Sequence, residues 1–215
     1  MHYFTLQYTK EVEFTEKKSV FIGVGKRVFS EDEAREFIDE MKRKYKDARH
    51  HVYAYTLFED MNIQRYSDDG EPQGTGGIPV LDVIKKNDLR NVCIVVIRYF
   101  GGVLLGAGGL TRAYVKGAAV AVEASGIIKR VEGVEAKLPL SYDHLGRVEH
   151  YLLENKIKII EAEYTEMVSL TLYLKREDYD QVKDEILNLT SGQAELGEGA
   201  KEMFYVKDNQ LLKEI

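Results

Sequence analysis

The feature that most constrains the fold is an uninterrupted apolar stretch, residues 91–100 (NVCIVVIRYF), with glycine-rich segments before and after it. Such a run is typical of a central β-strand whose two faces are both covered. The earlier segment, residues 66–78 (YSDDGEPQGTGGI), has too much glycine and too few apolar side chains for regular structure. The later segment, residues 101–110 (GGVLLGAGGL), is a second glycine loop. We therefore expect a buried strand with the two loops near it.

Helices are predicted around this strand. Residues 110–124 are rich in alanine and glycine, so this helix can approach a sheet closely, and Gly126 is suited to end it. An S-x-x-E capping box opening at Ser30 predicts a helix through about Lys46. Pro79 suits the first turn of a short helix. The strands predicted beside these helices are residues 20–29 and 50–58.

From residue 136 to about residue 196 the predicted elements follow the order β-α-β-β-α-β, which is typical of a ferredoxin-like domain. Val168, Leu170, Leu172 and Leu174 alternate strictly, so they predict an antiparallel strand with one open face. The tail after residue 200 either adds a strand or packs loosely. The predicted strands are 136–142, 157–164, 167–174 and about 193–196, and the predicted helices are 143–155, with Asp143 as N-cap, and 177–189.

Charge is divided unevenly along the chain. The 215 residues carry 30 basic and 36 acidic side chains, a net charge of −6 that by itself argues against a nucleic-acid binder. Residues 1–133, however, carry 20 basic and 19 acidic side chains, whereas residues 134–215 carry 10 and 17. We therefore predict an α+β chain of two domains, 1–133 and 134–215, of which only the second is acidic.

Composition excludes several classes of protein. The first nineteen residues contain no apolar segment typical of a secretory signal, and no later stretch approaches the length of apolar sequence that crosses a membrane. A cytoplasmic location without a membrane partner is the expectation. The one cysteine, Cys93, cannot form an internal disulfide, and inside the apolar run it is expected to be a buried structural thiol.

The second glycine loop lies between a strand and a helix, where backbone N–H groups can hold an anion. No nucleotide motif is complete there, because Ala107 and Gly108 occupy the Lys and Ser/Thr positions of a P-loop and Thr111 replaces the last glycine of a dinucleotide fingerprint. Tight turns and close packing, an anion or RNA-backbone site, and a catalytic nucleotide site all remain open. The candidate binding residues are Arg98, Gly101, Gly102, Gly106, Gly108, Gly109, Arg112 and Lys116.

The first glycine loop contains three acidic residues, Asp68, Asp69 and Glu71, near Gly74 and Thr75. Carboxylates can bind magnesium, but an acidic turn beside glycine is also typical of an Asx turn, so neither a metal nor another cofactor is assigned.

The neighbouring His50 and His51 lie on a predicted strand, where their rings point to opposite faces and cannot bind one ion together. One of them, His50 among the candidates, is expected to face the surface and to have a functional role.

Three stretches carry a resemblance to a known family: HHVYAYTL, RYSDDGEPQGTGGIPVLDVI and NVCIVVIRYFGGVLLGAGGLTRAYVKGAAVAVEASG. Together they resemble the signature of the IMPACT family, in particular its bacterial two-domain, YigZ-type members, over about residues 17–125. The family often reads A-T-H-N where this chain has residues 48–51 (ARHH), which places His50 at the family's histidine, and it often has alanine at Gly76.

The resemblance implies an N-terminal fold like the second domain of a small-subunit ribosomal protein and a C-terminal fold like the late domains of elongation factor G. Both imply a link to translation. In eukaryotic members the domain acts by protein binding, competing for a partner that activates a stress-responsive kinase of translation initiation, a role that transfers to a bacterial chain only by analogy. The resemblance brings no catalytic residue.

Three functions follow as hypotheses. The first is a non-enzymatic, translation-linked protein whose N-terminal groove, formed by the second glycine loop and its cations, binds RNA, the ribosome or a translation-related protein. The second is a nucleotide- or phosphate-binding enzyme related to small-molecule kinases, although the glycine loop of those kinases is missing. The third is a purely protein-binding regulatory module that uses the open sheet face of the C-terminal domain.

Overall fold

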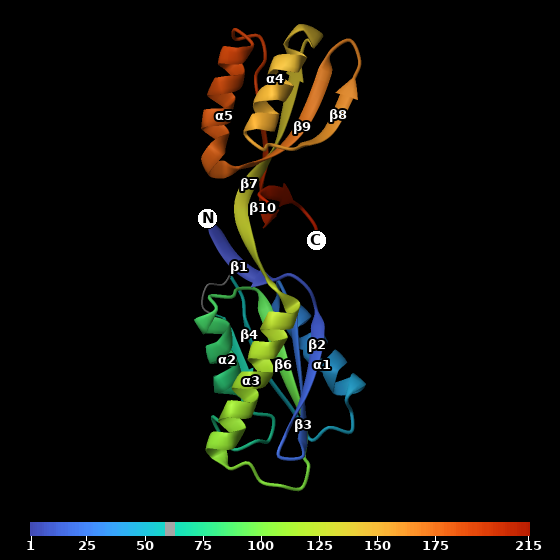
Figure 1. The fold of residues 1–215 in the computed structure, drawn as a ribbon, viewed down its shortest axis with the longest axis vertical. Coiled ribbons are helices and arrows are strands. Elements are labelled where there is room, and N and C mark those ends of the chain that lie inside the picture. The colour runs from blue at the N-terminus through green and yellow to red at the C-terminus, as the bar shows by residue number, and fades with distance from the viewer. Residues whose placement is uncertain (59–62) are drawn as a thin grey trace. The chain divides into compact units, whose positions relative to one another are not determined.

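The computed structural model describes residues 1–58 and 63–215. The chain has an α+β structure and divides into two compact units (Figure 1). The N-terminal unit consists of residues 3–128, and the C-terminal unit consists of residues 129–215 together with residues 1–2. A single strand, β7 (Ile127–Leu140), runs across residue 133, where the sequence suggested the boundary.

The N-terminal unit is built on an antiparallel sheet in the order β2-β3-β6-β4-β5. Its strands are β2 (Lys10–Glu16), β3 (Ser19–Arg27), β4 (His50–Thr56), β5 (Gln64–Ser67) and β6 (Val92–Tyr99). Helices α2 (Gly77–Lys86) and α3 (Ala107–Ser125) pack on one face and α1 (Glu31–Lys44) on the other. Strand β1 (His2–Leu6) pairs with β7.

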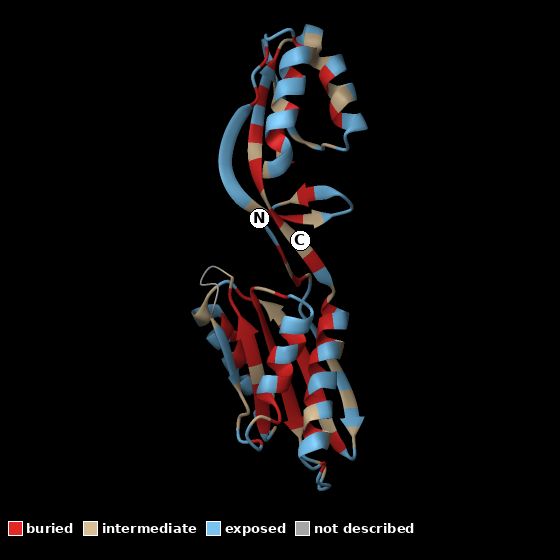
Figure 2. Cartoon of the chain, turned by 90° about the vertical axis from the view of Figure 1, so that its left-hand side faces the viewer, coloured by how far each residue is buried: buried red, intermediate tan, exposed pale blue. Residues whose placement is uncertain are grey.

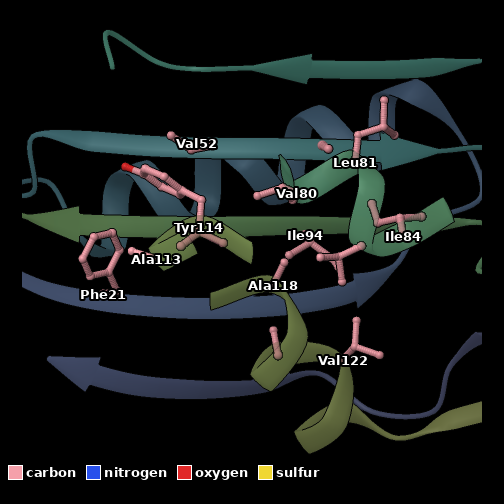
Figure 3. Close-up of a cluster of buried hydrophobic side chains, with 14 of the residues drawn as sticks. Phe21, Val52, Val80, Leu81, Ile84, Ile94, Ala113, Tyr114, Ala118 and Val122 are labelled. Carbon is pink, nitrogen blue, oxygen red and sulfur yellow. The ribbon is translucent and has the colours of Figure 1, made fainter. Parts of the chain in front are cut away.

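The central strand β6 is covered on both faces, as predicted from its apolar run. Val92, Ile94 and Val96 belong to the core beneath α2 and α3, and Cys93, Val95 and Ile97 belong to the core beneath α1. Figure 3 shows the first core, where side chains of α2 and α3 surround Ile94. In Figure 2 the three inner strands of this unit, β3, β4 and β6, are largely buried, in red, whereas the edge strands β2 and β5 are not.

Helix α3 lies very close to the sheet because two glycines face each other. A Cβ atom on Gly23 of β3 would lie 2.1 Å from the carbonyl oxygen of Gly117, and a Cβ atom on Gly117 would lie 2.7 Å from Val96 Cγ1. The predicted close approach of this helix is therefore confirmed. It begins at Ala107, three residues earlier than predicted, and Gly126 with φ of 66° ends it as expected.

The predicted capping of α1 is also confirmed. Glu33 N donates to Ser30 Oγ at 3.1 Å, while Glu33 Oε2 accepts a 2.9 Å bond from Phe29 N. Strands β1, β2 and β5 were not predicted, and β5 includes residues 66–67 of the segment that was expected to have no regular structure, because this segment pairs with β4.

The C-terminal unit contains a sheet in the order β11-β10-β7-β9-β8, and all these neighbours are antiparallel. Its remaining elements are α4 (Tyr142–Glu154), β8 (Ile159–Tyr164), β9 (Val168–Lys175), α5 (Arg176–Leu189), β10 (Gly197–Lys207) and β11 (Gln210–Leu212). Val148 of α4 and Ile186 of α5 join the alternate residues of β7 and β9 in one core, which places both helices on one face of the sheet (Figure 1).

Two expectations for this unit need correction. The last strand of the β-α-β-β-α-β series begins at Gly197 rather than at residue 193, because the N–H groups of Gln193 and Ala194 bond to Thr190 at the end of α5 instead of to a neighbouring strand. Asp143 lies in the first turn of α4, and Ser141 occupies the N-cap position. The tail continues β10 and adds β11. Within the described ranges, no helix is long and apolar enough to cross a bilayer.

Candidate functional site at the loop end of the N-terminal sheet

Both glycine loops lie at one end of the N-terminal sheet, which we call the loop end: β3 and β4 begin there and β6 ends there. The second loop packs directly on the turn between β2 and β3. A Cβ atom on Gly101 would lie 1.9 Å from the carbonyl oxygen of Lys18, and Gly101 N donates to Ser19 Oγ at 3.2 Å. Only glycine permits this approach, so the loop and the turn form one surface.

A buried ionic cluster lies beneath this surface. Glu71 Oε1 accepts a 2.7 Å hydrogen bond from Arg98 Nη1 and a 2.8 Å bond from the Tyr114 hydroxyl. Arg98 Nη2 donates to Ser19 Oγ at 3.3 Å, and His50 Nε2 lies 3.8 Å from the same Glu71 oxygen. Arg98 is 4% exposed, so it is not available as a surface cation of the kind the sequence suggested.

Tyr114 connects this cluster to α3. Figure 3 shows its ring among the apolar side chains of the core, with its hydroxyl at the edge of that core. Burial, and then the negative charge of Glu71, raise the pKa of Tyr114 far above its ordinary value of 10.0. The tyrosine therefore stays protonated and keeps donating to Glu71. Through these contacts the ionic cluster connects β3, β4, β6 and α3 to the first glycine loop. It therefore holds the loop in a fixed position at the loop end of the sheet.

The acidic residues of the first loop are bound to different partners. Asp68 Oδ1 accepts from Gly76 N at 2.9 Å and Gly77 N at 2.8 Å, and its Oδ2 accepts from Gly74 N at 2.8 Å. Asp69 Oδ2 accepts from the backbone of β4 at His51. The buried Thr75 hydroxyl donates to Pro72 O at 2.6 Å.

Asp68 therefore caps α2, and the Asx-turn interpretation describes this loop better than a magnesium site. Among the described residues, no group of three or more His, Cys, Asp or Glu side chains is arranged to hold a metal.

Both histidines of β4 are buried, so the expectation that one of them faces the surface is wrong. His50 is 8% exposed and its Nδ1 lies 2.9 Å from Asp69 O, while His51 is 6% exposed and its Nε2 donates to Tyr45 O at 3.1 Å. Burial lowers the pKa of His51 below its ordinary value of 6.5. The adjacent strand β6 holds Cys93, which is fully buried as predicted, and burial raises the pKa of its thiol.

The first turn of α3 is open toward the surface. Gly106 precedes it with φ of 72°, which favours glycine, and within residues 1–58 and 63–215 no side chain caps the turn. The carbonyl oxygen of Gly106 accepts a 2.9 Å hydrogen bond from Leu110 N, as expected at the start of a helix. Residues 107 and 108 are exposed, and the first turn contains no acidic residue. Free N–H groups at the positive end of a helix attract anions.

Two cations on α3 lie beside this open turn. Arg112 and Lys116 are both exposed. A Cβ atom on Gly108 would lie 3.7 Å from Arg112 Nη1, so the guanidinium lies against the first turn. Lys116 Nζ lies 4.5 Å from the ring centroid of Phe14 on β2. Of the remaining candidate glycines, Gly102 is exposed and Gly109 is half-buried.

Two further lysines were missed from the sequence. Lys17 and Lys18 form the tight turn between β2 and β3, where both have left-handed φ angles of 43° and 67°. Both are exposed, and Lys18 is the residue on which Gly101 packs. The sequence signal was weak, because a Lys-Lys pair is not one of the Asn-Gly or Asp-Gly pairs that usually mark a two-residue hairpin turn. We call residues 106–109, Arg112, Lys116, Lys17 and Lys18 the basic loop surface.

Comparison with known families matches both parts of the chain. Residues 17–122 match a model described as Impact N-terminal domain, and residues 138–193 match one described as Domain of unknown function (DUF1949). The chain is 38% identical over 197 residues to IMPACT family member YvyE of Bacillus subtilis, covering 92% of this chain and 91% of that protein. It is 31% identical over 182 residues to IMPACT family member YigZ of Escherichia coli, covering 84% and 89%.

A eukaryotic relative matches over a shorter part. The Protein IMPACT homolog of Dictyostelium discoideum is 36% identical over 95 residues, which cover 43% of this chain and 27% of that protein. Among solved structures, one titled "Crystal structure of an hypothetical protein" has a TM-score of 0.60 and 28% identity, and it covers 94% of this chain and 98% of its own. The likeness therefore extends over both units.

Proposed function

The chain belongs to the IMPACT family, and from that premise we propose that it is a non-enzymatic, cytoplasmic, translation-linked protein whose basic loop surface binds the phosphate backbone of RNA on the ribosome. The observation that carries this proposal is the open first turn of α3 with Arg112 beside it. Free backbone N–H groups and a guanidinium form the arrangement that binds phosphate oxygens.

The surrounding charges support a polyanion rather than a single phosphate. Lys116 lies one turn further along α3, and Lys17 and Lys18 add two cations on the hairpin that the second glycine loop contacts. Cations spread along a surface bind successive phosphates and release counterions. Phe100 is 41% exposed in the same loop and offers an aromatic face on which a base can stack.

We also propose a specific fold for each of the two units. The strand order β10-β7-β9-β8 with α4 and α5 on one face supports a ferredoxin-like C-terminal unit. The proposal assigns the N-terminal unit the fold of the second domain of a small-subunit ribosomal protein. Both assignments agree with a link to translation, which the family resemblance implies.

A nucleotide-dependent enzyme is the weaker candidate. Arg98 and Glu71 are buried against each other, so neither can reach a bound nucleotide at the surface. Asp68 is fully engaged by backbone N–H groups of the first loop and is not free to hold a magnesium ion for a triphosphate.

A protein partner at the same loop end is the second candidate, and one observation favours it. Leu104 is 83% exposed in the second glycine loop, and Val103 beside it is 38% exposed. Exposed apolar side chains of this kind are typical of protein interaction sites. Apolar contacts depend little on salt, whereas phosphate contacts weaken steeply as salt rises, so salt separates the two candidates.

Co-sedimentation with ribosomes tests the proposal. The wild-type chain is expected to sediment with ribosomes at about 50 mM salt and to be released at about 300 mM. The double variant Arg112→Ala/Lys116→Ala should stay largely in the supernatant at both concentrations. Lys85→Ala/Lys86→Ala, which removes two exposed cations from the last turn of α2, is the matched control and should bind normally. Failure of the wild type to sediment at low salt, or equal binding by the first variant, contradicts the proposal.

A further inference from the structure

The C-terminal unit contains a cavity of its own, with a volume of about 380 Å³. The end of α4, strand β9, the start of α5 and the β10–β11 hairpin form its walls. A second hollow of about 540 Å³ adjoins it and shares Lys156, Ile157 and Lys158. The volume of the first cavity falls within the range of small-molecule sites.

The walls of this cavity combine an apolar part with polar and charged side chains, Asp178 among them. Ile157, Leu174, Val182 and Leu211 line it, together with the aromatic ring of Tyr173. Leu174, Val182 and Leu211 are buried residues of the unit. A surface of this kind favours an organic ligand with an apolar body over an inorganic ion.

Two cations that line the cavity have no ion-pair partner within the described part of the chain, although the carboxylates of Glu149 and Asp208 line the adjoining hollow. Among the described residues, neither Lys156 nor Lys158 forms an ion pair or a side-chain hydrogen bond, and both line the two hollows. The neighbouring Lys175 differs, because it lies 3.8 Å from Asp178. Lys183 and Lys213 of the same unit are likewise paired, with Glu195 and Glu135. Lys137, Lys201 and Lys207 also have no ion-pair partner among the described residues, but none of them lines this cavity, whereas Lys156 and Lys158 both do.

We propose that this cavity binds a small organic anion, whose apolar body lies against Leu174, Val182 and Leu211 and whose phosphate or carboxylate group is held by Lys156 and Lys158. The side-chain amides of Gln181 and Gln210 also line the cavity and can donate hydrogen bonds to the ligand. The volume of about 380 Å³ suits a small molecule rather than a nucleic acid.

The backbone at Lys156 permits a clean test. Lys156 follows the C-cap of α4 with φ of 57°, and its N–H donates to Leu153 O while Ile157 N donates to Leu152 O. This is the helix ending in which glycine is the usual residue. Lys156→Gly therefore removes the ammonium group without straining the fold, and Lys158→Gln removes the second charge.

The probe for the test is 8-anilinonaphthalene-1-sulfonate, an aromatic anion whose fluorescence rises in apolar sites, used with the full chain. We expect the wild type to bind it with micromolar affinity and Lys156→Gly/Lys158→Gln to bind it about 10-fold or more weakly, since each lost charge contact accounts for about a factor of ten at most. The uncharged analogue N-phenyl-1-naphthylamine should bind both proteins equally. Lys137→Gln/Lys201→Gln, which lacks two exposed lysines outside the cavity, is the matched control.

Competition and mapping complete the experiment. Displacement of the probe by phenyl phosphate, or by phenylacetate, supports the proposal and distinguishes a phosphate ligand from a carboxylate ligand. Displacement by neither contradicts it. Amide chemical-shift changes on probe binding should cluster at residues 151–160 and 206–211 of the full chain. Shifts confined to other residues, or equal affinity of the probe for the wild type and the double variant, overturn the proposal.

Discussion

Arg98 on β6 and Glu71 in the first glycine loop form a buried ion pair, with Arg98 Nη1 2.7 Å from Glu71 Oε1 and both side chains less than 10% exposed. Arg98 lies three residues before Gly101, where the second glycine loop begins, and Glu71 lies in the first. The buried ion pair therefore links the two glycine loops. Removing one partner of such a pair leaves an uncompensated charge in the interior, which costs far more than an exposed pair does.

Glu71→Gln tests this relationship. The substitution keeps the shape of the side chain but leaves Arg98 without a counter-ion, so we expect the free energy of unfolding to fall by about 3 kcal/mol. Urea denaturation followed by circular dichroism measures the change. The control is Glu40→Gln, which breaks an exposed pair with Lys26 at 3.7 Å and should change stability by no more than about 0.5 kcal/mol. A loss from Glu71→Gln as small as the control would show that the pair does not stabilise the loop end.

The buried His51 predicts a dependence of stability on pH. Burial lowers the pKa of His51 in the folded chain below 6.5, so the unfolded chain takes up the proton first as the pH falls. The neutral imidazole therefore contributes its full stabilisation when the pH is above the pKa of His51 in the unfolded chain. This stabilisation is lost as the pH falls toward the lower pKa of His51 in the folded chain.

His51→Gln should flatten this dependence, because a glutamine amide can still donate to Tyr45 O and does not titrate. The measurement is the difference in melting temperature between variant and wild type from about pH 7 to pH 5. His150→Gln, at a histidine whose side chain is 71% exposed, is the control and should follow the wild type. An unchanged pH profile for His51→Gln would show that this imidazole is not the titrating group.

Two glycine-to-alanine substitutions should change stability in opposite directions. At Gly23 the new methyl group would lie 2.1 Å from the backbone oxygen of Gly117, so α3 must move from the sheet and stability should fall by about 2 kcal/mol. At Gly146, in the middle of α4, nothing lies within 4 Å, so alanine should stabilise the helix by roughly 0.5 to 1 kcal/mol. Thermal unfolding of both variants tests this, and a neutral Gly23→Ala would contradict the close packing of α3.

Asp68 is predicted to be structural. Because it accepts three backbone N–H groups at the start of α2, Asp68→Ala should lower the free energy of unfolding by about 2 kcal/mol. Asp68→Asn keeps one oxygen as an acceptor and should lose less. Adding Mg²⁺ should leave the melting temperature of the wild type unchanged. A rise in melting temperature with Mg²⁺ that Asp68→Ala abolishes would restore the metal interpretation.

The fold could be predicted where the sequence pattern of a segment agrees with its burial in the folded chain. The apolar run of β6 indicates burial on both faces, and the small residues of α3 indicate the close contact at Gly117. Strand β2 could not be predicted in the same way. It lies at the edge of its sheet, and although Val12 and Phe14 alternate with exposed glutamates, two half-buried apolar residues are a short and weak strand pattern.

The candidate site could be predicted only in part, because its geometry depends on contacts distant in sequence. Arg98 precedes a glycine loop and looks like a surface cation, but pairing of β6 with β4 places it opposite His50 and within reach of Glu71. Lys17 and Lys18 join the site only because Gly101 packs on their turn. The position of α3, by contrast, follows from its sequence, and with it the placement of Arg112 and Lys116 on one helix face.

The central claim is that the basic loop surface binds RNA through phosphate contacts. The most direct test measures the dissociation constant of the full chain for a short, labelled single-stranded RNA by fluorescence anisotropy over a range of KCl concentrations. We predict a linear fall of log affinity with log salt, and a slope for Arg112→Ala/Lys116→Ala that is shallower by about 1.4, since each lost phosphate contact removes about 0.7. Affinity that does not change with salt, or the same slope for both proteins, would contradict the account.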